Sequence, residues 1–226
     1  MNPNDITDIC IGVPELVDSN GAILLAPTQS ALRELRSAIR KSKAESIAVS
    51  LLFSFANPAH EQAVAQALAS LRLPISLSHQ ILPEFREFER GSTVALNAYL
   101  APKMQFYIHA LQSGLTLRHA SLSIMQSSGG ILSAASAARE PVRTILSGPA
   151  GGVIGALTVA RTAGISQILT FDMGGTSTDV ALLDASREPP TTSEGQVEGL
   201  PVSIPMLDIH TAGAGGGSLA WMDNAG

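Results

Sequence analysis

The chain has 226 residues, of which 45% are hydrophobic and 15% are charged, so it holds enough apolar side chain for a globular core and is not a disulfide-stapled miniprotein. Its 14 basic and 19 acidic residues give a net charge of −5, and the spread of the basic residues along the sequence argues against nucleic acid as a partner. The single cysteine, Cys10, excludes an internal disulfide; with no signal-peptide or membrane-spanning pattern, it favours a cytoplasmic protein without a membrane partner.

The first third of the chain alternates helical and strand patterns. Residues 28–44 carry apolar residues at helical spacing, with Thr28 as the N-cap. Residues 46–55 form a nearly continuous apolar run, typical of a strand covered on both faces. A helix opens at Pro58, and a second strand ends near Leu77. This alternation predicts the α/β class.

Residues 86–117 predict a long helix, which Pro102 is expected to bend or divide. The elements expected after it are a strand at 122–126, a turn at Gly129-Gly130, a short helix before Pro141, a strand at 142–146, a turn at Gly148-Pro149, a helix at 151–163, a strand at 167–171, an exposed loop at 187–199 and a strand-like run at 202–209.

The most informative stretch is 168–183, in which two β-prone runs flank a Gly-Gly-Thr turn and predict a β-hairpin. Gly174 and Gly175 can adopt positive φ and carry no Cβ, so backbone N–H groups can converge there on a phosphate. Thr176 and Thr178 add hydroxyl donors.

Two carboxylates flank the same turn. Asp172 and Asp179 would sit beside phosphate without repulsion if a hard cation such as Mg²⁺ lay between them, usually with waters. The alternative is that the glycines only form a turn and the aspartates cap local backbone groups. The residues by themselves leave both interpretations open.

Two further glycine clusters follow strand-like runs. The cluster from Gly213 to Gly217 precedes Ser218, which could open a helix with an anion-receptive start, or the cluster could be a surface loop. The cluster at 147–155 places small residues at a helix start, where they permit either close approach of the helix to the sheet or binding of a ligand. At Gly155 close packing is expected.

Several enzyme classes lack their required residues. The glycines have no neighbouring P-loop lysine, no dinucleotide-binding G-x-G-x-x-G and no serine-hydrolase elbow, and His60-Glu61 lacks the second histidine of a zinc helix. The histidines have no mutual metal spacing, so each is expected at the surface or in a local hydrogen bond. His210 is notable because it lies beside the second glycine cluster.

Three long motifs resemble, in this order and spacing, the hydantoinase A and 5-oxoprolinase family. They are Ser-Gly-Pro-Ala-Gly-Gly-Val from Ser147, Phe-Asp-Met-Gly-Gly-Thr-Ser-Thr-Asp-Val from Phe171, and Gly-Ala-Gly-Gly-Gly-Ser-Leu-Ala-Trp from Gly213. Residues 56–61 and 82–100 also resemble that family, so the resemblance covers nearly the whole chain.

The resemblance implies the two-lobed, ribonuclease-H-like architecture of the actin-like ATPases, which holds Mg-ATP between its lobes. Residues 1–100 would be the C-terminal part of the family's N-terminal region, and 101–226 the start of its core lobe. Family members are far longer and carry an earlier phosphate loop that this sequence lacks, so the architecture is expected to be incomplete at both ends, as in an internal fragment or a truncated member.

The resemblance also implies site residues. Gly174, Gly175 and Thr176 would contact phosphate, with Thr178 and Asp179 beside them and Asp179 supporting the turn. Asp172 would organise Mg²⁺ or its water shell, and Gly215, Gly216 and Gly217 would line the nucleotide cleft. No catalytic base is identified.

The implied activity is ATP-dependent opening of a cyclic amide, such as 5-oxoproline or a hydantoin, through phosphorylation of its carbonyl oxygen. Implied partners are this small-molecule substrate and a hydantoinase B-type subunit, with oligomerisation of the full-length form; the chain by itself is expected to be inactive. The alternatives are an ATP-dependent ketone carboxylase subunit and a non-catalytic nucleotide-binding remnant.

Overall fold

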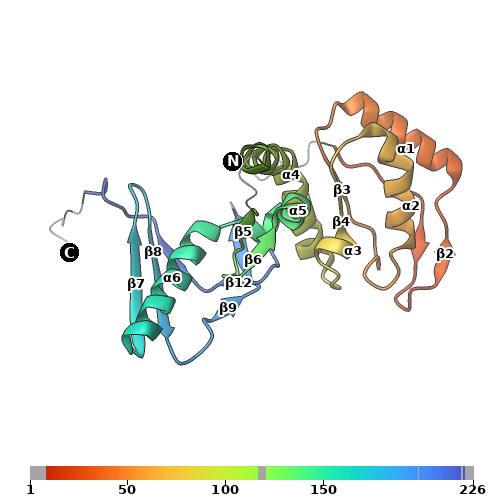
Figure 1. The fold of residues 1–226 in the computed structure, drawn as a ribbon. Coiled ribbons are helices and arrows are strands. Elements are labelled where there is room, and N and C mark those ends of the chain that lie inside the picture. The colour runs from red at the N-terminus through yellow and green to blue at the C-terminus, as the bar shows by residue number, and fades with distance from the viewer. Residues whose placement is uncertain (1–8, 117–120, 198, 220, 222–226) are drawn as a thin grey trace. The chain divides into compact units, whose positions relative to one another are not determined.

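The computed structural model describes residues 9–116, 121–197, 199–219 and 221. The chain divides into two compact units (Figure 1). Unit 1 comprises Met1–Ile124, Leu132–Val142 and Ser193–Ile204, and unit 2 comprises Met125–Ile131, Arg143–Thr192 and Pro205–Gly226. The division at residue 100 stays a prediction.

The N-terminal part of unit 1 is a small α/β arrangement. An antiparallel pair, β1 (Leu16–Val17) and β2 (Ile23–Leu25), precedes a parallel pair, β3 (Ile47–Val49) and β4 (Ile75–Leu77). The helices here are α1 (Gln29–Ser42), α2 (Ala59–Leu68) with its 3₁₀ extension η2 (Ala69–Leu71), and α3 (Ser78–Ile81). Because α2 connects two parallel strands, this part is a βαβ crossover.

Helix α1 confirms its sequence prediction. The Thr28 hydroxyl accepts the Ala31 N–H, and the apolar stripe of Leu32, Leu35 and Ile39 is buried. These side chains join a core cluster that includes Val64 of α2. Capping and one buried face therefore determine this helix, as the pattern predicts.

The strand expected at 46–55 is shorter than predicted: β3 begins at Ile47 and ends at Val49. At Leu51 the backbone finds side-chain partners in place of a strand. Its N–H donates to the Glu61 carboxylate at 3.0 Å, and its carbonyl accepts from the Arg90 guanidinium at 3.0 Å. A turn containing Phe53 at φ 56° follows.

Pro102 does not divide the long helix, since α4 (Glu87–Thr116) continues through it. A proline inside a helix costs about 3 kcal/mol, because it removes one hydrogen bond and crowds the preceding turn. Buried residues on both sides of it, including Val94, Ala98 and Ile108, supply tertiary contacts that offset this cost.

Unit 1 also receives later segments of the chain. These are the helix α5 (Ala134–Arg139) and the strands β10 (Gly195–Val197) and β11 (Leu200–Val202). The strands β5 (Ser123–Met125) and β6 (Ile131–Ser133) belong to unit 1 except for Met125 and Ile131, which belong to unit 2. The expected exposed loop at 187–199 is thus wrong in part, since it contains β10 and β9 (Thr191–Thr192). The Ser203 N–H donates to the Thr93 hydroxyl of α4, which anchors this segment.

The strand expected at 142–146 is wrong. Residues Pro141–Thr144 form the 3₁₀ turn η3, and the Val142 N–H donates to the side-chain oxygen of Asn97. The amide nitrogen of Asn97 donates to the carbonyl of Arg139. A fully buried asparagine of α4 therefore replaces the strand partner that an apolar run suggested.

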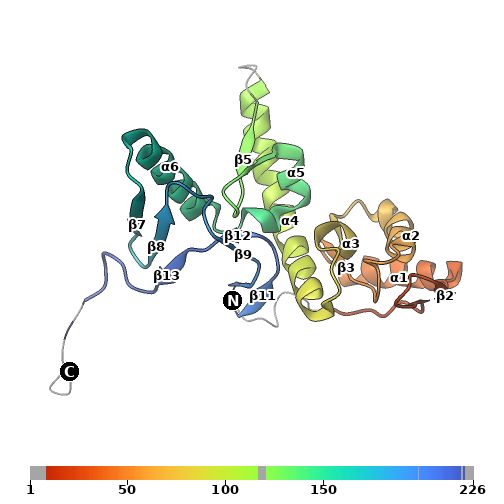
Figure 2. The same cartoon turned by 90° about the horizontal axis from the view of Figure 1, so that it is seen from below.

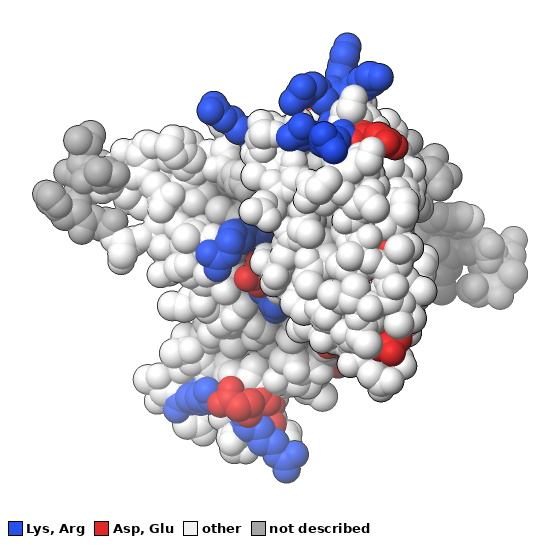
Figure 3. All heavy atoms as spheres, turned by 90° about the vertical axis from the view of Figure 1, so that its right-hand side faces the viewer, with Lys and Arg blue, Asp and Glu red and all other residues white. Residues whose placement is uncertain are grey.

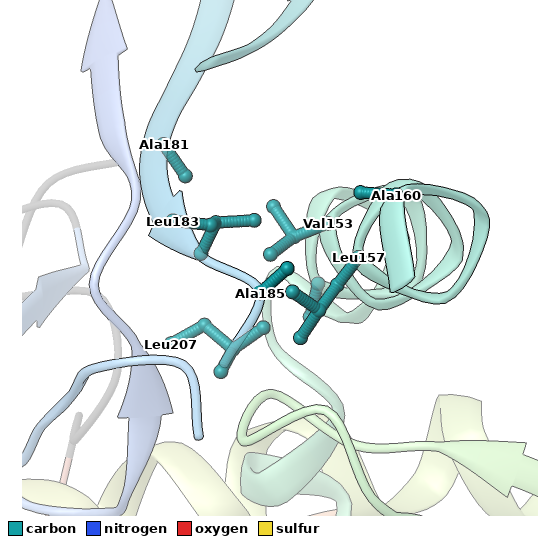
Figure 4. Close-up of a cluster of buried hydrophobic side chains, with 8 residues drawn as sticks. Val153, Leu157, Ala160, Ala181, Leu183, Ala185 and Leu207 are labelled. Carbon is teal, nitrogen blue, oxygen red and sulfur yellow. The ribbon is translucent and has the colours of Figure 1, made fainter. Parts of the chain in front are cut away.

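Unit 2 is a three-stranded antiparallel sheet with one helix on it (Figures 1 and 2). The sheet order is β13 (His210–Ala212), β8 (Thr178–Asp184) and β7 (Gln167–Met173), and β9 pairs with β12 (Met206–Leu207) beside it. Helix α6 (Ser147–Ala163) packs Val153 and Leu157 against Leu183 of β8 (Figure 4).

Helix α6 begins earlier than predicted. Gly148-Pro149 lies in its first turn rather than in a separate turn, a place where a proline costs no intrahelical hydrogen bond. The opposite face of the sheet is open: Leu169 and Phe171 of β7 and Leu182 of β8 are more than 60% exposed.

Charged side chains are sparse on the face of the molecule that Figure 3 shows. In Figure 3 the basic side chains gather in a few places, and most of that face is uncharged. The largest basic group along one element is Arg33, Arg36, Arg40 and Lys41 of α1. Two of these, Arg40 and Lys41, lie in the last helical turn, where cations favour the helix dipole. Among the described helices, none has the length and apolarity needed to cross a membrane.

Candidate functional site

The predicted hairpin at 168–183 is confirmed. β7 and β8 pair antiparallel in continuous register, with Asp172 opposite Asp179 and Met173 opposite Thr178. The turn between them is closed by the Gly174 N–H, which donates to the Ser177 carbonyl at 2.9 Å. The two carboxylates that flank the turn in sequence are therefore cross-strand neighbours on the face that α6 covers.

The second glycine cluster lies directly against this turn. The Gly216 N–H donates to the Gly174 carbonyl at 2.9 Å, and the Gly217 N–H donates to the Gly175 carbonyl at 3.1 Å. A Cβ on Gly215 would lie 2.6 Å from the Gly174 oxygen, which explains why this buried position is glycine. Two clusters about 40 residues apart in the chain thus form one structure.

No helix opens at Ser218 within the described residues, so that expectation is wrong. The Ser218 hydroxyl instead accepts the Gly215 N–H at 3.0 Å, and the Ser218 N–H donates to the Gly215 carbonyl. The cluster is a tight turn whose donors are used within the protein, rather than the start of a helix.

Two side chains of β8 connect the hairpin to this glycine loop and to the strand that leads into it. The buried Thr178 hydroxyl donates to the Ala214 carbonyl at 2.6 Å. The Asp179 carboxylate accepts the Thr211 hydroxyl of β13 at 2.6 Å. The Thr178 hydroxyl and one carboxylate oxygen of Asp179, both of which the sequence offered as ligand groups, therefore have partners in the protein.

The groups left facing solvent are at the tip of the turn. Gly175 and Thr176 are exposed, and within the described residues neither has a hydrogen bond from its N–H or from the Thr176 hydroxyl. A Cβ on Gly175 would meet nothing within 4 Å. The tip is consequently an open cradle of donors with room for an anion.

Gly174 and Gly175 do not use the positive φ that their lack of a side chain allows. Neither residue has φ between +20° and +160°, so positive φ does not require glycine at either position. What distinguishes Gly175 is the open space beside it.

The donor set suits Mg²⁺ better than a metal that needs a full protein cage. Asp172 is exposed, and Asp179 lies across from it on β8. Among the described residues there is no group of three or more His, Cys, Asp or Glu that could hold a metal. Mg²⁺ commonly takes one or two carboxylates, with waters and phosphate oxygens as its other ligands.

A groove of about 510 Å³ runs between α6 and β7 and reaches these carboxylates. Its walls are mostly small or apolar residues, such as Gly152 and Ala156 of α6 and Ile168 of β7. Asp172 and Asp179 are the two charged residues of its lining.

The glycine cluster at 147–155 lies in the first half of α6 and takes no part in the turn. A Cβ on Gly155 would meet nothing within 4 Å, so the close packing expected there is wrong. His210 is exposed on β13, paired in register with Val180.

Sequence reasoning missed a buried polar cluster in unit 1. The fully buried Glu61 carboxylate accepts hydrogen bonds from the Leu51 N–H, the Ser78 hydroxyl and the His79 N–H, and it lies 2.6 Å from Nδ1 of His79. Nδ1 of His60 likewise lies 2.6 Å from the Glu15 carboxylate.

His60 and His79 are therefore neither surface residues nor locally bonded, contrary to expectation. Their partners lie 45 and 18 residues away in the chain. The adjacent His60-Glu61 pair on α2 was the one available signal for these contacts.

Comparison with known proteins identifies the family. The family model described as Hydantoinase/oxoprolinase matches residues 90–226, and that of the Hydantoinase/oxoprolinase N-terminal region matches residues 2–71. Caprolactamase subunit alpha of Pseudomonas jessenii is 32% identical over 213 residues, which are 92% of this chain and 30% of that protein. The 5-oxoprolinase of Dictyostelium discoideum is 36% identical over 190 residues, 77% of this chain and 15% of that protein.

A solved structure of ATP-dependent acetone carboxylase, in a nucleotide-free state, superposes with a TM-score of 0.80 at 30% identity, over 95% of this chain and 31% of that one. This likeness confirms the α/β fold class. The chain spans about a third or less of the length of these relatives. With one family model covering more than half of its residues, the chain belongs to the hydantoinase/oxoprolinase family.

Proposed function

We propose that the turn at residues 174–177 binds the phosphates of a magnesium nucleotide, as part of an ATP-dependent enzyme that opens a cyclic amide. The observation that carries this proposal is the convergence of two glycine clusters on one exposed turn, beside two carboxylates in register. An isolated Asp-x-Gly-Gly-Thr turn would favour a purely structural role, whereas a turn supported from behind with free donors in front suits an anion.

The residues of the turn and the loop behind it would have different roles in binding the nucleotide. The N–H groups of Gly175 and Thr176 and the Thr176 hydroxyl would donate to phosphate oxygens, with Gly174 forming the start of the turn. Asp172 would hold Mg²⁺ through its water shell, and the ion would neutralise phosphate charge. The loop of Gly215, Gly216 and Gly217 would form the wall behind the turn.

The proposed reaction takes its substrate class from the relatives. 5-oxoproline and caprolactam, the compounds in the names of two of them, are both cyclic amides. Transfer of the γ-phosphoryl group of ATP to the carbonyl oxygen would make the ring carbon more electrophilic, so that water adds there, the C–N bond breaks and phosphate leaves. The products would be the ring-opened amino acid, ADP and phosphate.

We further propose that the whole protein works in an assembly with other subunits. One relative is named as subunit alpha of its enzyme, which supports a multi-subunit assembly with a hydantoinase B-type subunit and oligomerisation of the full-length form. A cytoplasmic location remains a prediction from the cysteine count.

The second candidate is an ATP-dependent ketone carboxylase subunit. It is favoured by the structural likeness to acetone carboxylase. Phosphate release from ATP, measured with a full-length form that contains this chain and with a B-type subunit, separates the two candidates. Stimulation by a lactam supports the hydrolase. Stimulation that needs a ketone together with bicarbonate, with labelled carbon entering the product, supports the carboxylase.

The experiment that tests the phosphate site is calorimetric titration of this chain with ATP or ADP, with and without Mg²⁺. Asp172→Ala is expected to abolish the Mg²⁺-dependent part of the binding. Asp184→Ala is a matched control, because Asp184 lies at the opposite end of the same hairpin, paired with Gln167. Equal effects of both substitutions, or nucleotide binding that does not depend on Mg²⁺, would contradict the proposed role of Asp172 in holding Mg²⁺.

A further inference from the structure

We propose that Thr178 and Asp179 are positioning residues, which fasten the glycine loop at 213–217 to the hairpin and thereby aim the amide donors of the turn. In this inference the Asp179 carboxylate acts as a hydrogen-bond acceptor for Thr211 and not as a cation ligand. The part that concerns nucleotide affinity rests on the proposed function; the part that concerns the loop does not.

The aim of the donors follows from the planarity of the peptide unit. In a trans peptide the C=O and the N–H of one unit point in opposite directions, and the described residues contain no cis peptide. The Gly174 carbonyl is held by the Gly216 N–H, so the Gly175 N–H of the same peptide unit points away from the loop.

The next peptide unit repeats the arrangement. The Gly175 carbonyl accepts the Gly217 N–H, so the Thr176 N–H also points away from the loop. Two consecutive amide donors are thus turned toward the same open side, where a Cβ on Gly175 would meet nothing. Two adjacent donors on one side form an anion-binding concavity.

The loop that fixes these peptide units has few side chains with which to hold itself. Residues 213–217 are four glycines and one alanine, a composition with high backbone entropy when unrestrained. Thr178 binds its start through the Ala214 carbonyl, in a position where the threonine is only 5% exposed. Thr211 binds the strand leading into it to Asp179.

The register explains why Asp179, rather than Asp172, has this role. Thr211 of β13 lies opposite Asp179 on the central strand β8, whereas Asp172 is on β7, which has β8 as its neighbour in the sheet order. A hydroxyl donor beside one of two facing carboxylates also offsets their mutual repulsion. Asp172 is left exposed for solvent or a cation.

The test separates the hydrogen-bond role of each side chain from its charge and shape. Amide hydrogen exchange of Gly216 and Gly217 is followed by NMR in the 226-residue chain, and Mg-ADP affinity is measured on the same samples. Asp179→Ala and Thr178→Val are expected to reduce protection of both amides, and Mg-ADP affinity, by about five- to tenfold.

The conservative variants are expected to rescue. Asp179→Asn keeps an oxygen that accepts the Thr211 hydroxyl, and Thr178→Ser keeps the donor to Ala214, so both should stay within about twofold of the native chain in protection and affinity. Thr170→Val is the matched control. It removes a hydroxyl that bonds to Ala181 within the same hairpin and should leave the two glycine amides protected.

Two results would overturn the inference. One is fast exchange of the Gly216 and Gly217 amides in the native chain. The other is an Asp179→Asn variant that keeps amide protection but loses Mg-ADP affinity as strongly as Asp172→Asn, which would make Asp179 a cation ligand. If the native chain binds no nucleotide, the proposed function fails, while the exchange data still decide whether the two side chains hold the loop.

Discussion

Gly215 and Gly175 have different surroundings, so alanine substitutions at these two positions should have opposite effects on stability. In Gly215→Ala the new Cβ would lie 2.6 Å from the Gly174 oxygen and 2.7 Å from the Thr176 nitrogen, at least 0.7 Å short of ordinary contact with backbone atoms. The loop must retreat, and the hydrogen bonds from the Gly216 and Gly217 amides, now 2.9 and 3.1 Å, would break. At about 1 kcal/mol for each bond, the free energy of unfolding should fall by about 2 kcal/mol.

In Gly175→Ala the added methyl meets no protein atom, and the backbone is not left-handed. The free energy of unfolding should therefore stay the same or rise by up to about 1 kcal/mol, because alanine restricts the unfolded chain. The same methyl occupies the open side of the turn, so Mg-ADP affinity should fall at least about tenfold as the phosphate is pushed out of hydrogen-bonding reach.

Urea unfolding and calorimetric titration of both variants check this crossed pattern. A Gly215→Ala chain with native stability and native affinity would show that the close contact between Gly215 and the turn does not exist. A Gly175→Ala chain with undiminished affinity would show that no ligand approaches the turn from its open side.

Three further predictions concern the scaffold. Leu157→Ala removes a side chain that is only 2% exposed, so it should lower the free energy of unfolding by about 3 kcal/mol in urea titrations. Leu182 is 73% exposed, so Leu182→Ala should change this free energy by less than about 0.5 kcal/mol. Equal effects of the two substitutions would contradict the described core. Glu61→Gln places an amide NH₂ group against groups that already donate, including His79, so it should lower the free energy of unfolding by about 3 kcal/mol or more. A variant of native stability would show that these hydrogen bonds are not formed. Hydrogen bonds from the Ser186 side chain and backbone hold the pKa of Asp184 below its ordinary value. The contribution of this carboxylate to stability should therefore be present above about pH 4 and disappear as the pH falls through the lowered pKa. An NMR titration midpoint at or above that of a free aspartate would contradict this.

The elements that the sequence predicted well are those determined by neighbours in the chain. Helix α1 depends on a cap at Thr28 and a stripe of three buried residues within one segment. The hairpin depends on two β-prone runs joined by a short turn, so its register follows from the turn. In both cases the deciding contacts span fewer than about 20 residues.

The elements predicted wrongly are those in which a distant side chain replaces a local partner. The run at 142–146 is apolar enough for a strand, but Asn97, 45 residues earlier, accepts the Val142 N–H. The run at 46–55 ends early because Glu61 and Arg90 take the backbone groups of Leu51. Composition and periodicity carry no information about such partners.

Arg90 is the clearest case of a residue whose role its sequence position hides. It is 1% exposed, donates to the carbonyls of Glu84 and Leu51, and lies 5.3 Å from the ring centroid of Phe55. A buried cation of this kind is rare unless its donors are used, and here both terminal nitrogens are used while Nε has no partner among the described residues. Only the fold shows that its partners are backbone carbonyls and an aromatic face.

The candidate site depends both on contacts within one segment and on contacts between distant segments, so only part of it could be predicted from the sequence. Motif spacing placed Asp172, Gly175 and Gly215 in two separate clusters, and each cluster by itself fitted a surface turn. The hydrogen bonds between the clusters show that the two glycines serve different purposes. Gly215 must be glycine because protein backbone lies against it, whereas Gly175 leaves an open space beside the turn. Since the donors at the tip are main-chain groups, substitutions alter them mainly by moving the peptide units, and the side chains that decide their direction lie behind the turn rather than in it.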